Sequence, residues 1–97
     1  MFEIEQGANG TMALVGRLDA AQAPKAQAAL DALTAATRLD FSRLDYVSSA
    51  GLGVLLKTQK RLMAAGGLTL FNVNPHIQDV FRYSGFDQIF KIEGAGA

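Results

Sequence analysis

The apolar positions of this chain alternate several times between a strand-like and a helix-like period. Residues 2–5 alternate apolar and polar side chains, and an apolar segment at residues 12–18 follows turn-forming residues at 7–10. Alternation with a period of two is typical of a half-buried strand, and glycine and asparagine between two such segments favour a turn. The N-terminus is therefore predicted to form a β-hairpin.

Two longer segments have the spacing of helices. Residues 24–36 are rich in alanine and open with a proline, which fits a first helical turn because its missing N–H has no partner there. Residues 48–65 repeat leucine and methionine at intervals of three and four, and the glycines at 66–67 are predicted to end that helix. The basic side chains that fall largely outside its apolar stripe, and are predicted to be solvated, are Lys57, Lys60 and Arg61. The alternative for these three residues is that they border a partner with an acidic rim.

Shorter segments complete the pattern. A short strand is predicted at residues 39–41, and after Ser42 a loop is predicted to lead into the long helix. A further strand is predicted at residues 68–73, and an asparagine followed by a proline predicts a capped helix over residues 74–83. Residues 89–92 are predicted to form a closing strand, so the expected order is ββαβαβαβ.

This order predicts a single α/β domain. Strands that alternate with helices require a partly parallel sheet with helices packed against it, and the N-terminal hairpin makes the sheet mixed. The chain has 97 residues, 49% of them hydrophobic, which is enough for one core and too short for two. We expect the domain to cover residues 1–93 and a flexible tail to cover residues 94–97, where glycine and alanine alternate.

Charge and cysteine content narrow the possible functions. Nine basic and nine acidic residues balance, whereas nucleic-acid binding requires clustered lysine and arginine, so no nucleic-acid partner is expected. Cysteine is absent, which excludes a disulfide framework, a thiolate metal site and a cysteine nucleophile. No apolar run reaches the length of a membrane span, and acidic residues stand where a signal peptide has basic ones, so a soluble cytoplasmic protein is expected.

Residues 47–53 hold the candidate functional chemistry. Two hydroxyls, on Ser48 and Ser49, and two glycines, Gly51 and Gly53, fall where a loop enters the long helix. The first turn of a helix has unpaired N–H groups and the positive end of the helix dipole, so a phosphorylated serine is stabilised there. Glycines also allow another protein to approach the backbone closely. The segment is therefore predicted to form a protein-binding surface.

The sequence around this segment resembles the STAS domain family, and specifically the bacterial anti-sigma factor antagonists. The family pattern is an Asp-aliphatic-Ser stretch, an aromatic or aliphatic pair, and a small polar motif of Asp-Ser-Ser/Thr-Gly type before a leucine-rich helix. Residues 40–42, 46–47 and 48–52 stand at these positions. The likeness extends over essentially the whole domain, to residues 16–19, 66–70, 74–75, 80–81, 84–86 and 89–90.

The resemblance implies a regulatory binding module of STAS fold rather than an enzyme. Such antagonists bind an anti-sigma factor, itself a protein serine kinase, and thereby free a sigma factor. Phosphorylation of the serine at the helix start abolishes this binding, and a phosphatase restores it. No cofactor is implied, and family members usually act as monomers. The expected partner-binding residues are Asp19, which is expected to flank the serines, and Ser48, Ser49, Ala50, Gly51, Leu52 and Gly53.

One position departs from the family pattern. If Gly51 is the motif glycine, the usual phosphoacceptor position is occupied by Ala50. Ser49 is then the predicted phosphorylation site, with Ser48 as the alternative. A further alternative is that phosphorylation does not switch this chain. It would then serve as a STAS scaffold, a ligand-sensing module or an accessory module of lipid transport.

Simpler interpretations apply to the same residues. Either Ser48 or Ser49 can be an N-cap, a common role of serine at a helix start that is worth about 1 kcal/mol. A serine-hydrolase site requires a supported general base. The only histidine, His76, is predicted to face solvent in the first turn of a helix, so a hydrolase is disfavoured.

Three aspartates and three phenylalanines complete the candidate residues. Asp19, Asp40 and Asp45 could form a metal or acid–base cluster, but aspartate often satisfies its own backbone in a turn, and that interpretation is preferred for Asp45. No metal site is predicted. The aromatic side chains expected to pack in the core are Phe81, Phe86 and Phe90.

Overall fold

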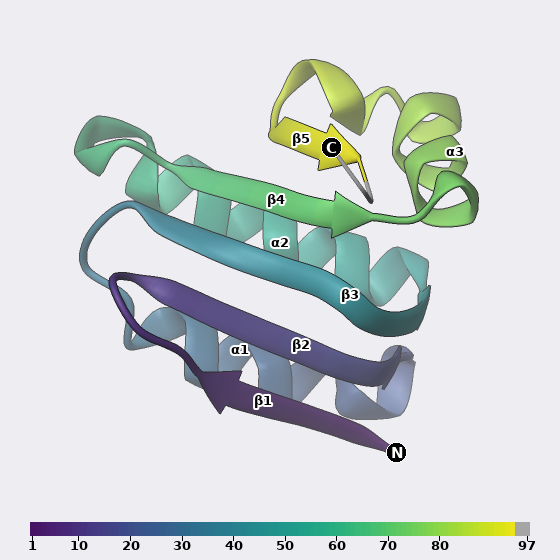
Figure 1. Ribbon diagram of the computed structural model, residues 1–97, viewed down its shortest axis with the longest axis horizontal. Helices are drawn as coiled ribbons and strands as arrows, with labels where there is room; N and C mark the ends of the chain where they lie inside the picture. Colours follow the sequence, from purple (N-terminus) through teal and green to yellow (C-terminus); the bar gives the residue numbers. More distant parts are fainter. Residues whose placement is uncertain (95–97) are drawn as a thin grey trace.

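The computed structural model describes residues 1–94 and has the predicted order of strands and helices (Figure 1). One mixed sheet has the strand order β1-β2-β3-β4-β5, in which β1 runs antiparallel to β2 and the other neighbours are parallel. The strands are β1 (Phe2–Gln6), β2 (Thr11–Leu18), β3 (Thr37–Val47), β4 (Leu68–Val73) and β5 (Lys91–Gly94). The helices are α1 (Ala23–Asp31), α2 (Ser49–Leu62) and α3 (Pro75–Ser84), with short 3-10 segments at Ala20–Gln22, Met63–Ala65 and Phe86–Gln88.

The predicted N-terminal hairpin is confirmed. Asn9 and Gly10 have φ angles of 56° and 75°, and the Thr11 N–H donates to the Ala8 carbonyl at 3.2 Å. Positive φ at both central positions is the type I′ geometry, whose twist matches that of the two strands it joins.

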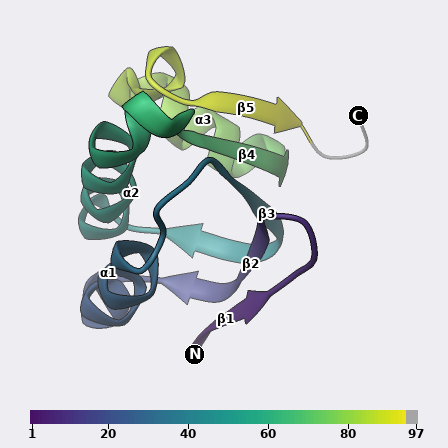
Figure 2. The same cartoon turned by 90° about the vertical axis from the view of Figure 1, so that its left-hand side faces the viewer.

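Helices α1 and α2 lie side by side against one face of the sheet, as Figure 2 shows. The side chains of Leu39, Phe41 and Leu55 are fully buried between these layers. The opposite face of the sheet carries exposed or half-buried side chains, among them Arg38 and Tyr46. Among the helices of residues 1–94, none has both the length and the apolar content that crossing a membrane requires.

The C-terminal aromatic residues pack in the core as predicted. The Phe81 ring lies 6.4 Å from the Phe41 ring and 5.6 Å from the Phe90 ring, measured between centroids. Phe86 is partly buried against the same cluster. Helix α3 is thereby fixed to the core that α2 and the sheet share.

The prediction of a loop after Ser42 was wrong, because β3 continues to Val47. The buried side chains in this part of β3 recur every third residue, at Phe41, Leu44 and Val47, instead of every second residue. The β2–β3 register shifts twice over this stretch, and each shift places one extra residue in β3. These are β-bulges, which break the two-residue alternation by which a strand is recognised in sequence.

Other element boundaries differ from the predictions by a few residues. Helix α1 ends at Asp31, five residues before its predicted end, and α2 passes into the 3-10 turn Met63–Ala65 before Gly66, whose φ of 115° ends the helix as predicted. The closing strand covers Lys91–Gly94 rather than 89–92, so Gly94 lies in the sheet and not in the predicted tail. Residues 95–97 of that tail lie outside the described residues.

Arg61 is exposed, as predicted, but its side chain also makes a contact that the sequence did not indicate. Its guanidinium donates hydrogen bonds to the carbonyls of Leu30 at 2.7 Å and Leu33 at 2.8 Å. These carbonyls lie at the end of α1, where helical carbonyls lack intrahelical partners and a positive charge is favourable. Arg61 therefore attaches α2 to the C-terminus of α1.

Replacing Arg61 with methionine is expected to lower the free energy of unfolding by about 1–2 kcal/mol, because two carbonyls lose a charged donor. Urea denaturation followed by circular dichroism measures the change. Lys60→Met is the matched control, since Lys60 is an exposed neighbour, and it is expected to change stability by less than about 0.5 kcal/mol. Equal losses of stability in Arg61→Met and Lys60→Met would contradict the role of Arg61 in attaching α2 to α1.

Candidate functional site

Helix α2 begins where two neighbouring parallel strands end. At this edge β2 and β3 pair through Leu18 and Val47, and the Ser48 N–H donates to the Leu18 carbonyl at 2.9 Å. The chain enters α2 at Ser49, immediately afterwards. Because Asp19 follows Leu18 and Ser48 follows Val47, the structure places these two polar residues at the same edge of the sheet.

Ser48 is the N-cap of α2. Its backbone is extended, its Oγ accepts a hydrogen bond from the Gly51 N–H at 3.2 Å, and its carbonyl accepts the first helical bond, from Leu52. The N-cap interpretation is therefore confirmed for Ser48. Asp19 has the same role for the 3-10 segment beside it, where its carboxylate accepts from the Gln22 N–H at 3.2 Å.

Ser49, in contrast, presents a free hydroxyl. It is the first residue of α2 and is exposed, and within residues 1–94 its side chain makes no hydrogen bond. Ala50 follows and is also exposed, and the first turn contains no acidic side chain. The N–H groups of a first turn are unpaired and electropositive, so a negative group on the Ser49 oxygen would be stabilised there.

Gly51 is buried, contrary to the expectation that it faces a partner. A Cβ atom at this position would lie 2.7 Å from the Leu18 Cγ, 3.0 Å from the Leu18 carbonyl oxygen and 3.0 Å from a Val47 methyl group. The missing side chain therefore allows α2 to approach the ends of β2 and β3. Its function is close packing within the domain.

Gly53, in contrast to Gly51, faces the surface of the domain. A Cβ atom there would meet no other atom within 4 Å, and the residue is partly exposed. Leu52, between the two glycines, is only 7% exposed and packs inward. Of the residues from Ser49 to Gly53, the structure brings Ser49, Ala50 and Gly53 to the surface.

The sequence of the chain matches a family described as "Mlab, STAS domain" over residues 1–93. The chain belongs to the STAS domain family. The resemblance stated from the motif residues is thereby confirmed, and the α/β sheet with an N-terminal hairpin is the fold of this family.

One relative of this STAS domain is named as an anti-sigma factor antagonist. BtrV of Bordetella bronchiseptica, assigned as an anti-sigma factor antagonist, is 49% identical over 55 residues, which are 56% of this chain and 47% of BtrV. The match thus spans about half of the length of that relative.

Two solved structures have the same fold. An anti-sigma factor antagonist from Mycobacterium paratuberculosis superimposes with a TM-score of 0.80 at 22% identity, covering 96% of this chain and 84% of that one. The Bacillus cell fate determinant SpoIIAA in its phosphorylated form has a TM-score of 0.66 at 24% identity, covering 95% and 90%. At these identities the structures establish the architecture of the STAS domain, which confirms the predicted fold class.

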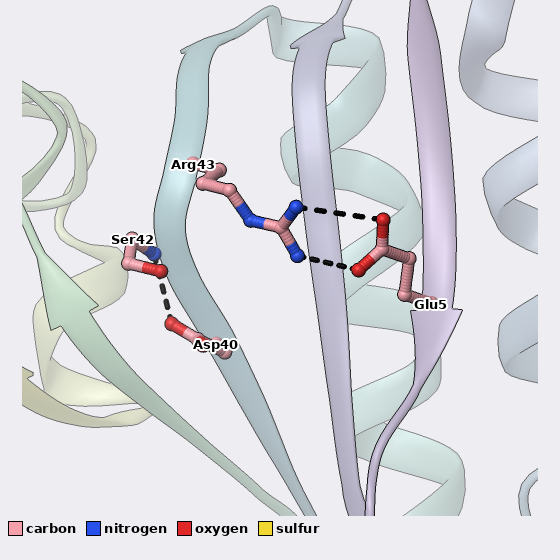
Figure 3. Close-up of polar contacts among 4 residues, drawn as sticks. All are labelled: Glu5, Asp40, Ser42 and Arg43. Atoms are coloured by element: carbon pink, nitrogen blue, oxygen red, sulfur yellow. Dashed lines mark hydrogen bonds and ion pairs between the residues drawn. The ribbon is translucent and has the colours of Figure 1, made fainter.

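On the sheet face opposite α2, this STAS domain carries a polar network (Figure 3). Asp40 accepts hydrogen bonds from the Ser42 N–H at 2.9 Å and the Asn72 amide at 3.1 Å, and Arg43 pairs with Glu5. Burial raises the pKa of Asp40, but these hydrogen bonds and the nearby Arg43 together bring the pKa below its ordinary value. The carboxylate is therefore ionised and stabilises the bulged part of β3.

The other candidate residues of the STAS domain lie apart from the α2 start. Asp45, predicted to be in a turn, is exposed on β3, so that prediction was wrong. His76 is exposed in the first turn of α3, as predicted, and that helix is capped by Asn74, which accepts from the Ile77 N–H at 2.9 Å. Over residues 1–94, no three histidine or acidic side chains are grouped closely enough to hold a metal ion.

Sequence reasoning missed Gln59, which connects α2 to the C-terminal segment. Its Oε1 accepts from the Leu68 N–H at 2.7 Å, and its Nε2 donates to the Ile89 carbonyl at 2.9 Å. The signal was its spacing, four residues after Leu55 and three before Leu62, on the apolar stripe. A glutamine at a core-facing position needs hydrogen-bond partners, so this spacing predicts a structural role.

A cavity of about 360 Å³ lies between α3 and β5, away from the α2 start. Its volume is at the small end of the range of ligand pockets. The cavity is lined by Gln78, Arg82, Asp87, Phe90 and Ile92.

Proposed function

We propose that this STAS domain is an anti-sigma factor antagonist that binds an anti-sigma factor of the serine-kinase type and thereby frees a sigma factor. The observation that carries the proposal is the exposed hydroxyl of Ser49, unbonded within residues 1–94, at the N-terminus of α2. The likeness to BtrV and to solved antagonists supports it. In this function the domain acts in the cytoplasm as a monomer, without catalysis or a cofactor.

The proposed contact surface is smaller than the whole motif. Ser49, Ala50 and Gly53 are accessible on α2, and Asp19 lies beside them at the sheet edge. With no side chain on Gly53 and only a methyl group on Ala50, a partner can approach the helix backbone closely. Gly51, Leu52 and the Ser48 cap support this surface from inside.

Ser49 is the proposed phosphoacceptor, ahead of Ser48. The Ser48 oxygen already accepts a hydrogen bond and is partly buried, whereas the Ser49 oxygen is exposed. A phosphate adds about −1.5 to −2 charges and a hydration shell, which oppose a close contact at this point. Phosphorylation of Ser49 would therefore release the partner.

Incubation with ATP and the cognate anti-sigma kinase is expected to place phosphate on Ser49, located by peptide mass spectrometry. The cognate factor is the anti-sigma factor of the source genome that binds the purified chain most tightly. Ser49→Ala should prevent the modification and retain binding. Ser49→Asp should weaken binding at least about tenfold, because an unpaired charge is costly to bury in a close contact.

Ser48→Ala is the matched control. It removes the cap and should lower stability by about 1 kcal/mol, while phosphate still appears on Ser49. Phosphate on Ser48 instead would overturn the choice of acceptor, and no phosphate on either residue would remove the switch while leaving the binding function. If no anti-sigma factor of the genome binds the chain, the proposed function is wrong.

A second candidate is an accessory module of lipid transport or ligand sensing. The alanine at position 50 and the cavity between α3 and β5 favour it. It predicts that the chain co-purifies from its native cell with membrane-transport proteins, and that no anti-sigma factor is recovered. Recovery of an anti-sigma kinase and no transport protein would exclude it.

A further inference from the structure

The outward surface of α2 continues well beyond Ser49. At about 100° per residue, the side chains at Ser49, Gly53 and Lys60 point in nearly the same direction, over about 16 Å of helix. Leu56 and Met63 lie on one flank of this line, and Lys57 lies on the other. Met63 lies just past the last residue of α2, in the adjoining 3-10 turn, and we call these six residues the outer stripe of α2. Within it, Leu56 and Gly53 are half-buried and the other four are exposed.

The two lysines of the outer stripe have no counter-charge. Helix α2 contains no acidic residue, and within residues 1–94 neither Lys57 nor Lys60 forms an ion pair. Most other basic side chains within residues 1–94 already interact with another group. The engaged cations are Lys25, Arg38, Arg43 and Arg82 in ion pairs, Arg17 over the Tyr46 ring and Arg61 on two carbonyls. A chain with balanced charge thus keeps two unpaired positive charges, those of Lys57 and Lys60, on the outer stripe.

The flank of the outer stripe nearest the C-terminal segment is apolar. Met63 is 61% exposed and Ile89 is 38% exposed, although both are large hydrophobic side chains. The hydrogen bond from the Gln59 side chain to the Ile89 carbonyl, 2.9 Å long, holds this segment beside α2. Apolar side chains next to unpaired basic ones match a partner whose own surface is apolar at its centre and acidic at its rim.

We infer that the outer stripe of α2 binds an acidic, amphipathic surface of the anti-sigma factor, in which carboxylates face Lys57 and Lys60. This inference rests on the proposed function. It also gives the switch an electrostatic cause. Phosphate on Ser49 adds about −1.5 to −2 charges at one end of a stripe that carries +2, so the attraction for an acidic partner is weakened.

An anionic membrane is the other surface that basic and apolar side chains can bind, and the structure favours a protein. Lipid-binding segments typically use clusters of 4–8 basic residues, each worth about 1 kcal/mol, and the outer stripe has only Lys57 and Lys60. Gly53 also leaves an opening along the helix, which a shaped protein surface can fill.

The test compares Lys57→Glu/Lys60→Glu with wild type in surface plasmon resonance against the cognate anti-sigma factor, over a range of salt concentrations. The wild-type association rate should fall as salt rises, and the double variant should associate about tenfold or more slowly at low salt. The difference in association rate between wild type and the double variant should become smaller at high salt, because screening weakens the electrostatic attraction.

Lys91→Glu is the matched control, since Lys91 is exposed on β5, away from α2, and forms no ion pair within residues 1–94. It should associate no more than about twofold more slowly than wild type. The inference would be supported if replacing carboxylate residues of the partner with lysine restored the association rate of the double variant. Circular dichroism of each variant shows that it is folded.

Two results would overturn the inference while leaving the proposed function intact. In the first, the Lys57→Glu/Lys60→Glu variant associates with the anti-sigma factor at the wild-type rate, although the Ser49→Asp variant binds poorly. The second is binding to phosphatidylserine vesicles that is lost in the double variant, together with unchanged binding to the anti-sigma factor, which assigns the stripe to a membrane. A wild-type chain that binds no anti-sigma factor overturns the proposed function itself.

Discussion

Gly51→Ala is expected to lower the free energy of unfolding by about 2–3 kcal/mol, because the added methyl group overpacks a closely packed junction. The new Cβ would stand 2.7 Å from the Leu18 Cγ and 3.0 Å from the Leu18 carbonyl oxygen. The backbone oxygen cannot rotate away as a side chain can, and it also accepts the Ser48 N–H. Helix α2 would therefore have to shift away from the ends of β2 and β3. Urea denaturation measures the loss.

Gly53→Ala, two residues along the same helix, is the matched control. The new methyl group meets nothing within 4 Å, and alanine is favoured over glycine in a helix by about 1 kcal/mol, so stability should rise by about 0.5–1 kcal/mol. Binding to the anti-sigma factor should weaken, because the methyl group fills the opening in the outer stripe. Equal destabilisation by the two substitutions would contradict the assignment of Gly51 to packing and Gly53 to the surface.

Gln59→Ala is expected to lower the free energy of unfolding by about 2–4 kcal/mol, because it leaves two backbone groups without partners. The Leu68 N–H and the Ile89 carbonyl both bind the Gln59 side chain, which is only 5% exposed. Amide exchange should in addition rise at the start of β4, where the Leu68 N–H loses its acceptor. Denaturation and hydrogen exchange together measure both effects.

Gln88→Ala is the control for Gln59, because Gln88 is exposed on the 3-10 turn Phe86–Gln88 and its backbone N–H bond to Gly85 does not depend on its side chain. It should change stability by less than about 0.5 kcal/mol. A loss of stability in Gln59→Ala no larger than in Gln88→Ala would show that the buried glutamine is dispensable.

The order of strands and helices was predictable because most elements follow one period and have clear ends. The type I′ hairpin, the Asn74 cap and the Gly66 helix end each depend on residues only a few positions apart. Strand β3 was not predictable in full. Its two bulges give buried residues a three-residue spacing, and bulges are set by pairing with β2 rather than by local sequence.

The position of the candidate segment at the start of a helix was predictable, and the structural roles of its residues were less so. Two serines and two glycines at a helix start indicated the place. Which serine is the cap depended on where α2 begins, and the structure assigns that role to Ser48. Which glycine is buried depended on how α2 packs against the end of β2. The residues in contact there, Leu18 and Gly51, are 33 positions apart, so no local sequence pattern encodes their contact. The Arg61 contact with α1 was missed for the same reason.

The position of the interface is the central claim, and hydrogen exchange followed by mass spectrometry tests it most directly. The purified chain is compared with and without the cognate anti-sigma factor, and then with the chain phosphorylated on Ser49. Protection is expected in the first turns of α2 and around Ile89, on the side of the outer stripe, and phosphorylation should remove it. Protection confined to the opposite sheet face, around Arg38 and Tyr46, with α2 unchanged, would contradict the claim.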